Sequence, residues 1–121
     1  MKHTIEIPIR TISWLNIRGS FWRHQKRKKA EKSAMYIAWR TEFGGHPPQP
    51  PLRVTFTRVA PRSLDAGDNL ESAFKYIRDE LAQCMGLKND AGTEVEWKSQ
   101  QRKGGSKEYT VIVEIEELGE K

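Results

Sequence analysis

The sequence holds little cysteine, few acidic residues in its first half and no long hydrophobic run. One cysteine, Cys84, stands among 121 residues, which excludes an internal disulfide and cysteine-rich zinc sites. No apolar stretch approaches the ~18 residues needed to cross a bilayer. Residues 1–10 alternate polar and apolar side chains, unlike a secretory signal peptide. We therefore expect a cytoplasmic protein that has no membrane partner.

Charge is divided unevenly along the chain. Lys and Arg number 21 and Asp and Glu number 16, which gives a net charge of +5. Residues 1–63 hold 13 basic and 3 acidic side chains, whereas residues 64–121 hold 8 and 13. A basic half beside an acidic half indicates an anionic partner for one surface, most commonly nucleic acid. A merely solvated basic face is the alternative.

Hydrophobic periodicity predicts an α+β protein made of one domain over residues 1–121. Alternating apolar side chains predict strands over 3–12, 52–60, 94–100 and 109–116. Helical repeats predict helices over 21–43 and 69–85. The element order is therefore β-α-β-α-β-β. Pro8 lacks an N–H, so we expect the first strand to lie at an edge of the sheet.

Each predicted helix carries an apolar stripe. In the first helix the stripe is Ala30, Ala34 and Ile37, widened by Met35, Ala38 and Trp39. In the second helix the stripe consists of Leu70, Ala73, Phe74, Ile77, Leu81 and Cys84. Asp68 and Glu71 predict a capping box at its start, and Gly86 predicts its end.

A short acidic segment precedes the second helix. Asp65 and Asp68 flank Gly67 there, and a third acid, Asp90, follows the helix. Each acid taken singly also suits a cap or a turn. Mg²⁺ prefers oxygen ligands and needs only one or two carboxylates beside substrate phosphates, so the three suit phosphodiester hydrolysis. The helix spans about 25 Å at ~1.5 Å per residue, so Asp90 must return through a loop to join them.

The segment Asp65-Ala66-Gly67-Asp68-Asn69-Leu70, with the following helix and Asp90, resembles the RusA family of Holliday junction resolvases. The element order and the polar loop with Asn16 are also similar. These are small, dimeric, Mg²⁺-dependent nucleases, often encoded by prophages. The resemblance implies a mixed sheet packed against two helices, a homodimer, and hydrolytic cleavage of branched DNA without a small-molecule cofactor.

Carried over by residue, the resemblance makes Asp65, Asp68 and Asp90 the catalytic carboxylates that hold Mg²⁺, or Mn²⁺ in its place. Asn69 and Ser72 would support this site. Two residues separate the first two acids here, whereas the best-known members have one. Those members also carry a catalytic lysine where this chain has Ser72. Lys75, one turn along the same side of the helix, would take the lysine's role at the phosphate.

The residues expected to contact DNA lie in the basic first third of the chain: Asn16, Arg18, Arg23, Lys26, Arg27, Lys28, Lys29 and Lys32. The altered acid spacing and the serine motivate a second hypothesis, a DNA- or junction-binding protein without catalysis. A third hypothesis is a small interaction module with a solvated basic face.

Overall fold

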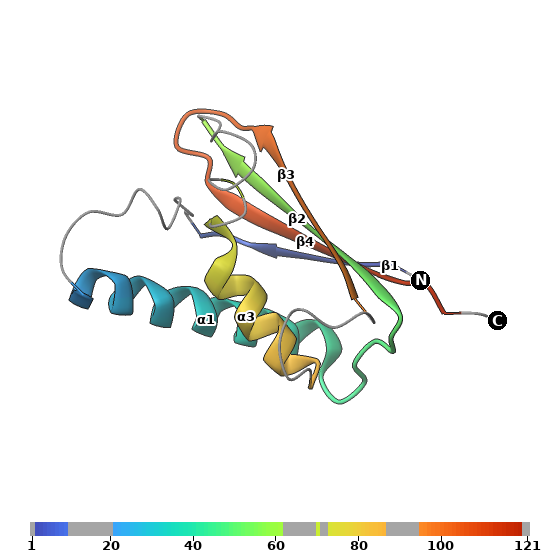
Figure 1. The fold of residues 1–121 in the computed structure, drawn as a ribbon. Coiled ribbons are helices and arrows are strands. Elements are labelled where there is room, and N and C mark those ends of the chain that lie inside the picture. Colours follow the sequence, from blue (N-terminus) through green and yellow to red (C-terminus); the bar gives the residue numbers. More distant parts are fainter. Residues whose placement is uncertain (1, 10–20, 62–69, 71–72, 87–94, 120–121) are drawn as a thin grey trace.

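The computed structural model describes residues 2–9, 21–61, 70, 73–86 and 95–119 (Figure 1). The described elements follow one another as β1 (Lys2–Ile7), α1 (Phe21–Phe43), β2 (Leu52–Ala60), α3 (Lys75–Cys84), β3 (Val95–Lys103) and β4 (Thr110–Glu117). The predicted α+β class and the β-α-β-α-β-β order are confirmed.

The described strands form one mixed sheet in the order β1-β4-β2-β3. β4 runs antiparallel to both of its neighbours, whereas β2 and β3 are parallel and are joined through α3. Both helices lie on the same side of this sheet (Figure 1). β1 is an edge strand, as Pro8 predicted. It ends at Ile7, before the proline, and residues 10–12 of the predicted strand lie outside the described part.

The hydrophobic core lies between the sheet and the two helices. Inward-facing residues of β2 and β4 are fully buried: Leu52, Val54, Phe56, Val111, Val113 and Ile115. Phe56 stacks on Phe74, which directly precedes α3, with ring centroids 5.3 Å apart. It also stacks on Trp97 of β3 at 5.9 Å. Aromatic stacking adds stability beyond the apolar area that it buries, so these contacts hold α3 and β3 to the centre of the sheet.

The opposite face of the sheet is polar. Arg53 on β2 bonds Glu96 on β3 at 3.1 Å and Glu116 on β4 at 3.3 Å. Lys2 on β1 pairs with Glu114 on β4 at 3.1 Å. Alternation along each strand therefore separates an apolar face toward the helices from a charged outer face.

The buried side of α1 differs from the predicted stripe. Four residues spaced four apart face the core: Glu31, Met35, Trp39 and Phe43. Ala30 is exposed and Ile37 is 62% exposed, so the prediction that these two are buried is wrong. Burial of Met, Trp and Phe removes far more apolar area from water than burial of alanine, so the large side chains set the rotation of the helix.

The second predicted helix is interrupted at Phe74. Leu70 and Ala73 are helical, Phe74 is a turn residue with φ −99° and ψ 4°, and α3 then runs from Lys75 to Cys84. The predicted stripe is confirmed: all of its members are buried except Cys84, which is partly buried against the core. Gly86, at φ +79°, follows the helix where the sequence places its end. The predicted capping box, Asp68 and Glu71, lies outside the described residues.

The turn between β3 and β4 depends on a glycine. The Gly105 N–H donates to Glu108 Oε1 at 2.7 Å, and this carboxylate lies beside Gly104. A methyl group added at Gly104 would meet Glu108 Oε1 at 2.8 Å and Val59 Cγ1 at 2.9 Å. At Gly105 the nearest atom would be 3.7 Å away, an ordinary contact.

We therefore expect Gly104→Ala to lower the free energy of unfolding by about 1–3 kcal/mol, because a methyl group must displace Val59 or the Glu108 side chain. Gly105→Ala is the matched control. It should leave stability unchanged or raise it by ~0.5 kcal/mol, since alanine restricts the unfolded chain. Urea denaturation followed by circular dichroism measures both. Equal stability of the two variants would contradict this account of the turn.

Candidate nucleic-acid interface

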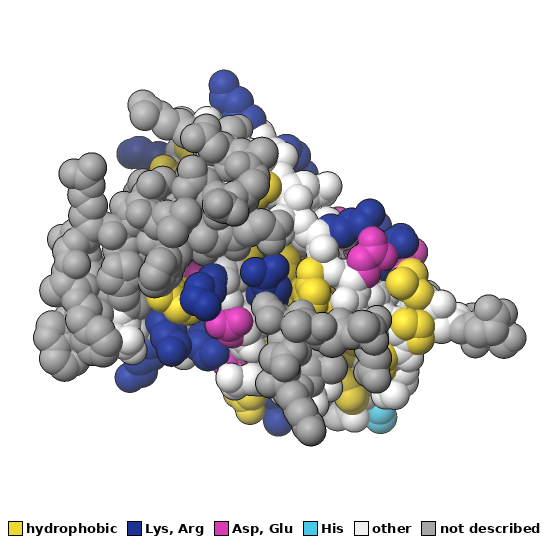
Figure 2. Space-filling view, viewed as in Figure 1, with side chains coloured by type: hydrophobic (Ala, Val, Ile, Leu, Met, Phe, Trp, Pro, Cys, Tyr) yellow, Lys and Arg dark blue, Asp and Glu magenta, His cyan; other side chains and the backbone are white. Residues whose placement is uncertain are grey.

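The first half of α1 presents a row of basic side chains to solvent. Lys26, Lys28 and Lys29 are all exposed. Figure 2 shows Lys and Arg side chains gathered over this part of the molecule. Within the described part of the chain, none of the three lysines forms an ion pair. Three unpaired ammonium groups on one helix form a surface suited to phosphate groups.

Two other basic residues of α1 face α3 instead. Arg27, whose side chain is 14% exposed, pairs with the buried Glu31 and lies 6.0 Å from the ring centroid of Tyr76. The Lys32 ammonium lies 3.8 Å from Glu80. Both were predicted to contact DNA. The structure gives each an acidic partner within the protein, so the solvent-facing charge of α1 comes mainly from the three exposed lysines.

Glu31 is a carboxylate buried in the core. It is 1% exposed, and desolvation raises its pKa to about 6, against the opposing effect of Arg27. Neither Nη atom of Arg27 has a hydrogen-bond partner among the described residues. Burial of this pair therefore leaves some of its hydrogen-bonding groups without partners among the described residues. Loss of hydration destabilises the ionised carboxylate more than the interaction with Arg27 stabilises it.

Lys75 stands at the first residue of α3 with about half of its side chain exposed. Its ammonium lies 3.8 Å from the Asp79 carboxylate, one turn along the helix. A cation in the first turn opposes the helix dipole, and a lysine that precedes its acid at this spacing is the weaker orientation. Local helix stability therefore does not explain a lysine here, and its charge remains accessible.

Most of the predicted catalytic residues lie outside the described residues. These are Asp65, Asp68, Asn69, Ser72 and Asp90. Asn16 and Arg18 also lie outside them, and of Arg23 only the helical backbone is described. The ranges that are described contain no group of three or more His, Cys, Asp or Glu residues able to hold a metal ion. The predicted metal site therefore stays a prediction.

The fold fixes one end of each of the two connections that carry the predicted acidic ligands. The connection that carries Asp65 and Asp68 leaves β2 at Ala60. The connection that carries Asp90 enters β3 at Val95, which pairs with Leu52 at the other end of β2. A strand of nine residues separates these points by about 26 Å. A shared metal site requires the two connections to approach each other along this length.

Arg58 is a buried cation that sequence reasoning missed. It is 6% exposed near the end of β2, two residues before Ala60. The inward alternation of Leu52, Val54 and Phe56 predicts that position 58 also faces the helices, so this alternation was the available signal. A buried guanidinium lowers the pKa of any carboxyl group close to it and so favours anions at this end of the sheet.

Cys84 is a poor nucleophile. Burial and the neighbouring Glu80 raise the pKa of its thiol to about 11, so the thiol is neutral near pH 7. This agrees with its prediction as a small core residue.

Comparison with known proteins identifies no family for this chain. No model of a protein family matches it, and a search of curated proteins finds no similar sequence. No helix in the described ranges is long and apolar enough to span a membrane. Function is therefore inferred from the residues and the fold.

We expect the stability of the protein to fall by about 2 kcal/mol as pH rises from 4.5 to above 6, at ~1.4 kcal/mol per pH unit of pKa difference. The folded-state pKa of Glu31 lies above its ordinary value of 4.5, so the fold favours the protonated form. This contribution is complete below pH 4.5 and is lost as pH rises through 6.

Chemical denaturation of wild type and Glu31→Gln at several pH values between 4 and 7.5 isolates this contribution, because the difference between the two should change over that interval. A pH-independent difference between wild type and Glu31→Gln would show that Glu31 does not titrate in this range.

Proposed function

We propose that this protein is a Mg²⁺-dependent endonuclease that cuts branched DNA. The observation that carries the proposal is the solvent-facing row of Lys26, Lys28 and Lys29 on α1. This row belongs to a fold whose β-α-β-α-β-β order is similar to that of RusA-type resolvases. The acidic segment before α3, which resembles the same family, supports hydrolysis rather than binding alone.

DNA binding would begin with the lysine row. Lys26 and Lys29 stand three residues apart and so share one side of α1, and Lys28 widens the charged surface. Contacts of this kind bind the phosphate backbone and carry no sequence information. Recognition would therefore favour the shape of the DNA over its base sequence, as expected of a protein that acts on junctions.

Hydrolysis would take place at the connection between β2 and α3. Ala60 and Leu70, which lie close to its two ends, are both buried. Asp65 and Asp68 would hold Mg²⁺, with Asp90 as the third carboxylate and Asn69 in support. Carboxylate oxygens are the donors that Mg²⁺ prefers. The bound metal would orient a water molecule and stabilise charge on the scissile phosphate.

Lys75 would assist at the phosphate. Its position at the start of α3 places it seven residues after Asp68, and half of its side chain is open to solvent. An ammonium group close to the scissile phosphate would stabilise negative charge that develops in the transition state.

Binding without catalysis is the second candidate. It is favoured by a separation of about 26 Å along the strands. This separation lies between Ala60, where the connection that carries Asp65 and Asp68 begins, and Val95, where the connection that carries Asp90 ends. It is also favoured by Ser72, which stands at the position of the family's catalytic lysine.

The decisive measurement is cleavage of a labelled four-way junction, with linear duplex as control substrate, in Mg²⁺, Mn²⁺ or chelator. We expect paired nicks that require metal, and a loss of at least about 100-fold in rate for Asp65→Asn and Asp68→Asn. Junction affinity should be kept or increased, because these changes remove negative charge.

Glu96→Gln is the matched control for this assay: the same carboxylate-to-amide change at an exposed position on the outer face of β3 should leave cleavage within a few fold of wild type. Asp90→Asn tests the third ligand separately. Its full activity would exclude Asp90 from the site. Tight junction binding by wild type with no cleavage in either metal would replace the nuclease proposal with the binding protein.

A second measurement tests the lysine row. Replacing Lys26, Lys28 and Lys29 together by alanine should make the slope of log affinity against log salt shallower by about 2.7, at ~0.9 for each phosphate that the variant no longer neutralises. The matched control replaces the exposed Lys98, Lys103 and Lys107 of β3 and its turn, and it should keep the wild-type slope. Fluorescence anisotropy with a labelled junction at several salt concentrations measures both slopes. An unchanged slope for the α1 variant would remove α1 from the DNA-binding surface.

A further inference from the structure

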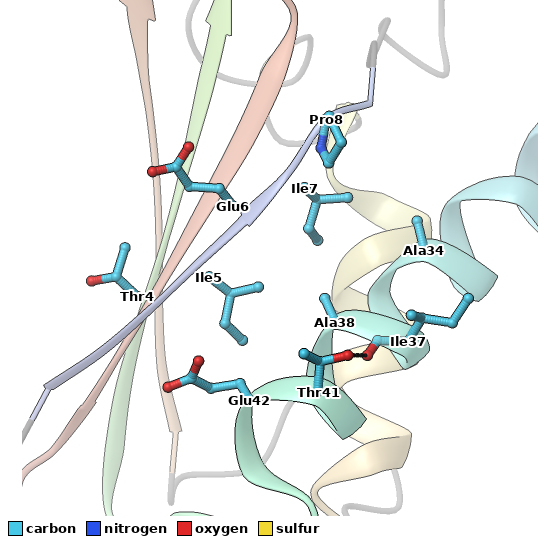
Figure 3. A pocket seen from close by; sticks show the side chains of 10 residues that line it. All are labelled: Thr4, Ile5, Glu6, Ile7, Pro8, Ala34, Ile37, Ala38, Thr41 and Glu42. Carbon is cyan, nitrogen blue, oxygen red and sulfur yellow. Dashed lines mark hydrogen bonds between the residues drawn. The ribbon is translucent and has the colours of Figure 1, made fainter.

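A groove runs between β1 and α1 along one edge of the sheet (Figure 3). Its volume is about 460 Å³. Ile5 and Ile7 of β1 point toward α1 and form one side, and Ala34, Ile37 and Ala38 form the other. Its lining is therefore largely apolar, although the groove opens to solvent.

The strand that borders this groove has a free edge. Among the described strands, β1 pairs only with β4, from Lys2 opposite Glu116 to Ile7 opposite Val111. Its other edge has no partner strand in the described part of the chain, which leaves its backbone N–H and C=O groups available to one. Such an edge is a template for another strand. Pro8 follows directly and cannot donate, so pairing on this edge is limited to β1 itself.

The helix beside the free edge carries an uncovered apolar stripe. Ala30, Ala34, Ile37 and Thr41 repeat at helical spacing on a flank of α1, where Ala34, Ile37 and Thr41 line the groove; Ala30 is exposed and Ala34 is partly packed against the core. Ile37 is 62% exposed. The Thr41 hydroxyl donates to the Ile37 carbonyl at 2.8 Å, so it is satisfied within the helix. The stripe and the strand edge thus form one continuous surface that could be buried together.

We propose that a second copy of this chain covers this surface, with the two β1 strands paired antiparallel about Thr4. The sequence of β1 is self-complementary in this register. Lys2 faces Glu6 of the partner subunit, Glu6 faces the partner's Lys2, and Thr4 faces the partner's Thr4. Opposite charges and threonine pairs are favourable cross-strand neighbours on one face of a sheet.

The two-fold axis that relates the two β1 strands also relates the two α1 helices. Each subunit therefore contributes the same surface to the interface. The sheet would continue from one subunit into the other, and Ile37 would be buried between the two α1 helices. Lys2 would then lie between Glu114 of its own chain, 3.1 Å away, and the partner's Glu6. This interface rests on described residues only and does not depend on nuclease activity.

Sedimentation velocity of the full chain, without DNA and over a range of protein concentration, tests the interface. Wild type should approach twice the 14.0 kDa chain mass. Ile37→Ser should raise the dissociation constant at least about tenfold, because it removes the largest apolar side chain of the stripe. Tyr36→Ser is the matched control, since Tyr36 is 47% exposed but does not line the groove. A dimer equally resistant to both changes would place the interface elsewhere.

Charge exchange tests the register. Glu6→Lys places lysine against lysine, and Lys2→Glu places glutamate against glutamate, so each variant alone should be monomeric. An equimolar mixture should form a heterodimer, because every lysine again faces a glutamate. Unchanged circular dichroism of each variant shows that it is folded. A monomeric wild type at all concentrations, or a mixture that fails to associate, would overturn the proposal. Neither result bears on DNA cleavage, which is measured separately.

Discussion

The stacking of Phe56 between Phe74 and Trp97 is the contact on which the rest of the structure depends. Phe56 is fully buried at the centre of β2, and the two partners bring the start of α3 and the strand β3 to it. It joins the first half of the chain to the second, and so joins the basic half to the acidic half. It holds the start of α3 to the sheet, while Arg27 and Lys32 of α1 contact α3 directly.

α1 has three sides with different roles. Its large apolar side chains complete the core, its exposed lysines form the basic surface, and its small side chains border the free edge of β1. The Arg27–Glu31 ion pair lies between the core residues and the exposed lysines of α1, and both of its charged side chains are largely buried. Because apolar side chains occur on more than one side of α1, the periodic pattern included the exposed Ala30 and Ile37 together with Met35 and Trp39, which are buried as predicted.

Much of the fold could be predicted because its signals are local. Strand alternation located β2 and β4 to within a residue, and Pro8 placed β1 at an edge. The core stripe of α3 was correct because its large apolar side chains all fall on one side. Less of the candidate site could be predicted from the sequence. The inward orientation of Arg58 follows from the alternation of β2, but the contacts of Arg27 with Tyr76 and of Lys32 with Glu80 depend on the packing of α1 against α3, which no local pattern contains.

The sequence by itself determined the type and order of the described elements, since periods of 2 and 3.6 residues are properties of the backbone. It also determined that the first half of the chain is basic. Only the tertiary structure decided which of those charges reach solvent, because Arg27 and Lys32 form ion pairs with Glu31 and Glu80. The strand order likewise left β1 with a free edge beside Ile37. The Lys32–Glu80 contact and the edge position of β1 arise from packing between segments far apart in the chain. The rotation of α1 that buries Glu31 follows from burial of its largest apolar side chains, which outweighs local preference.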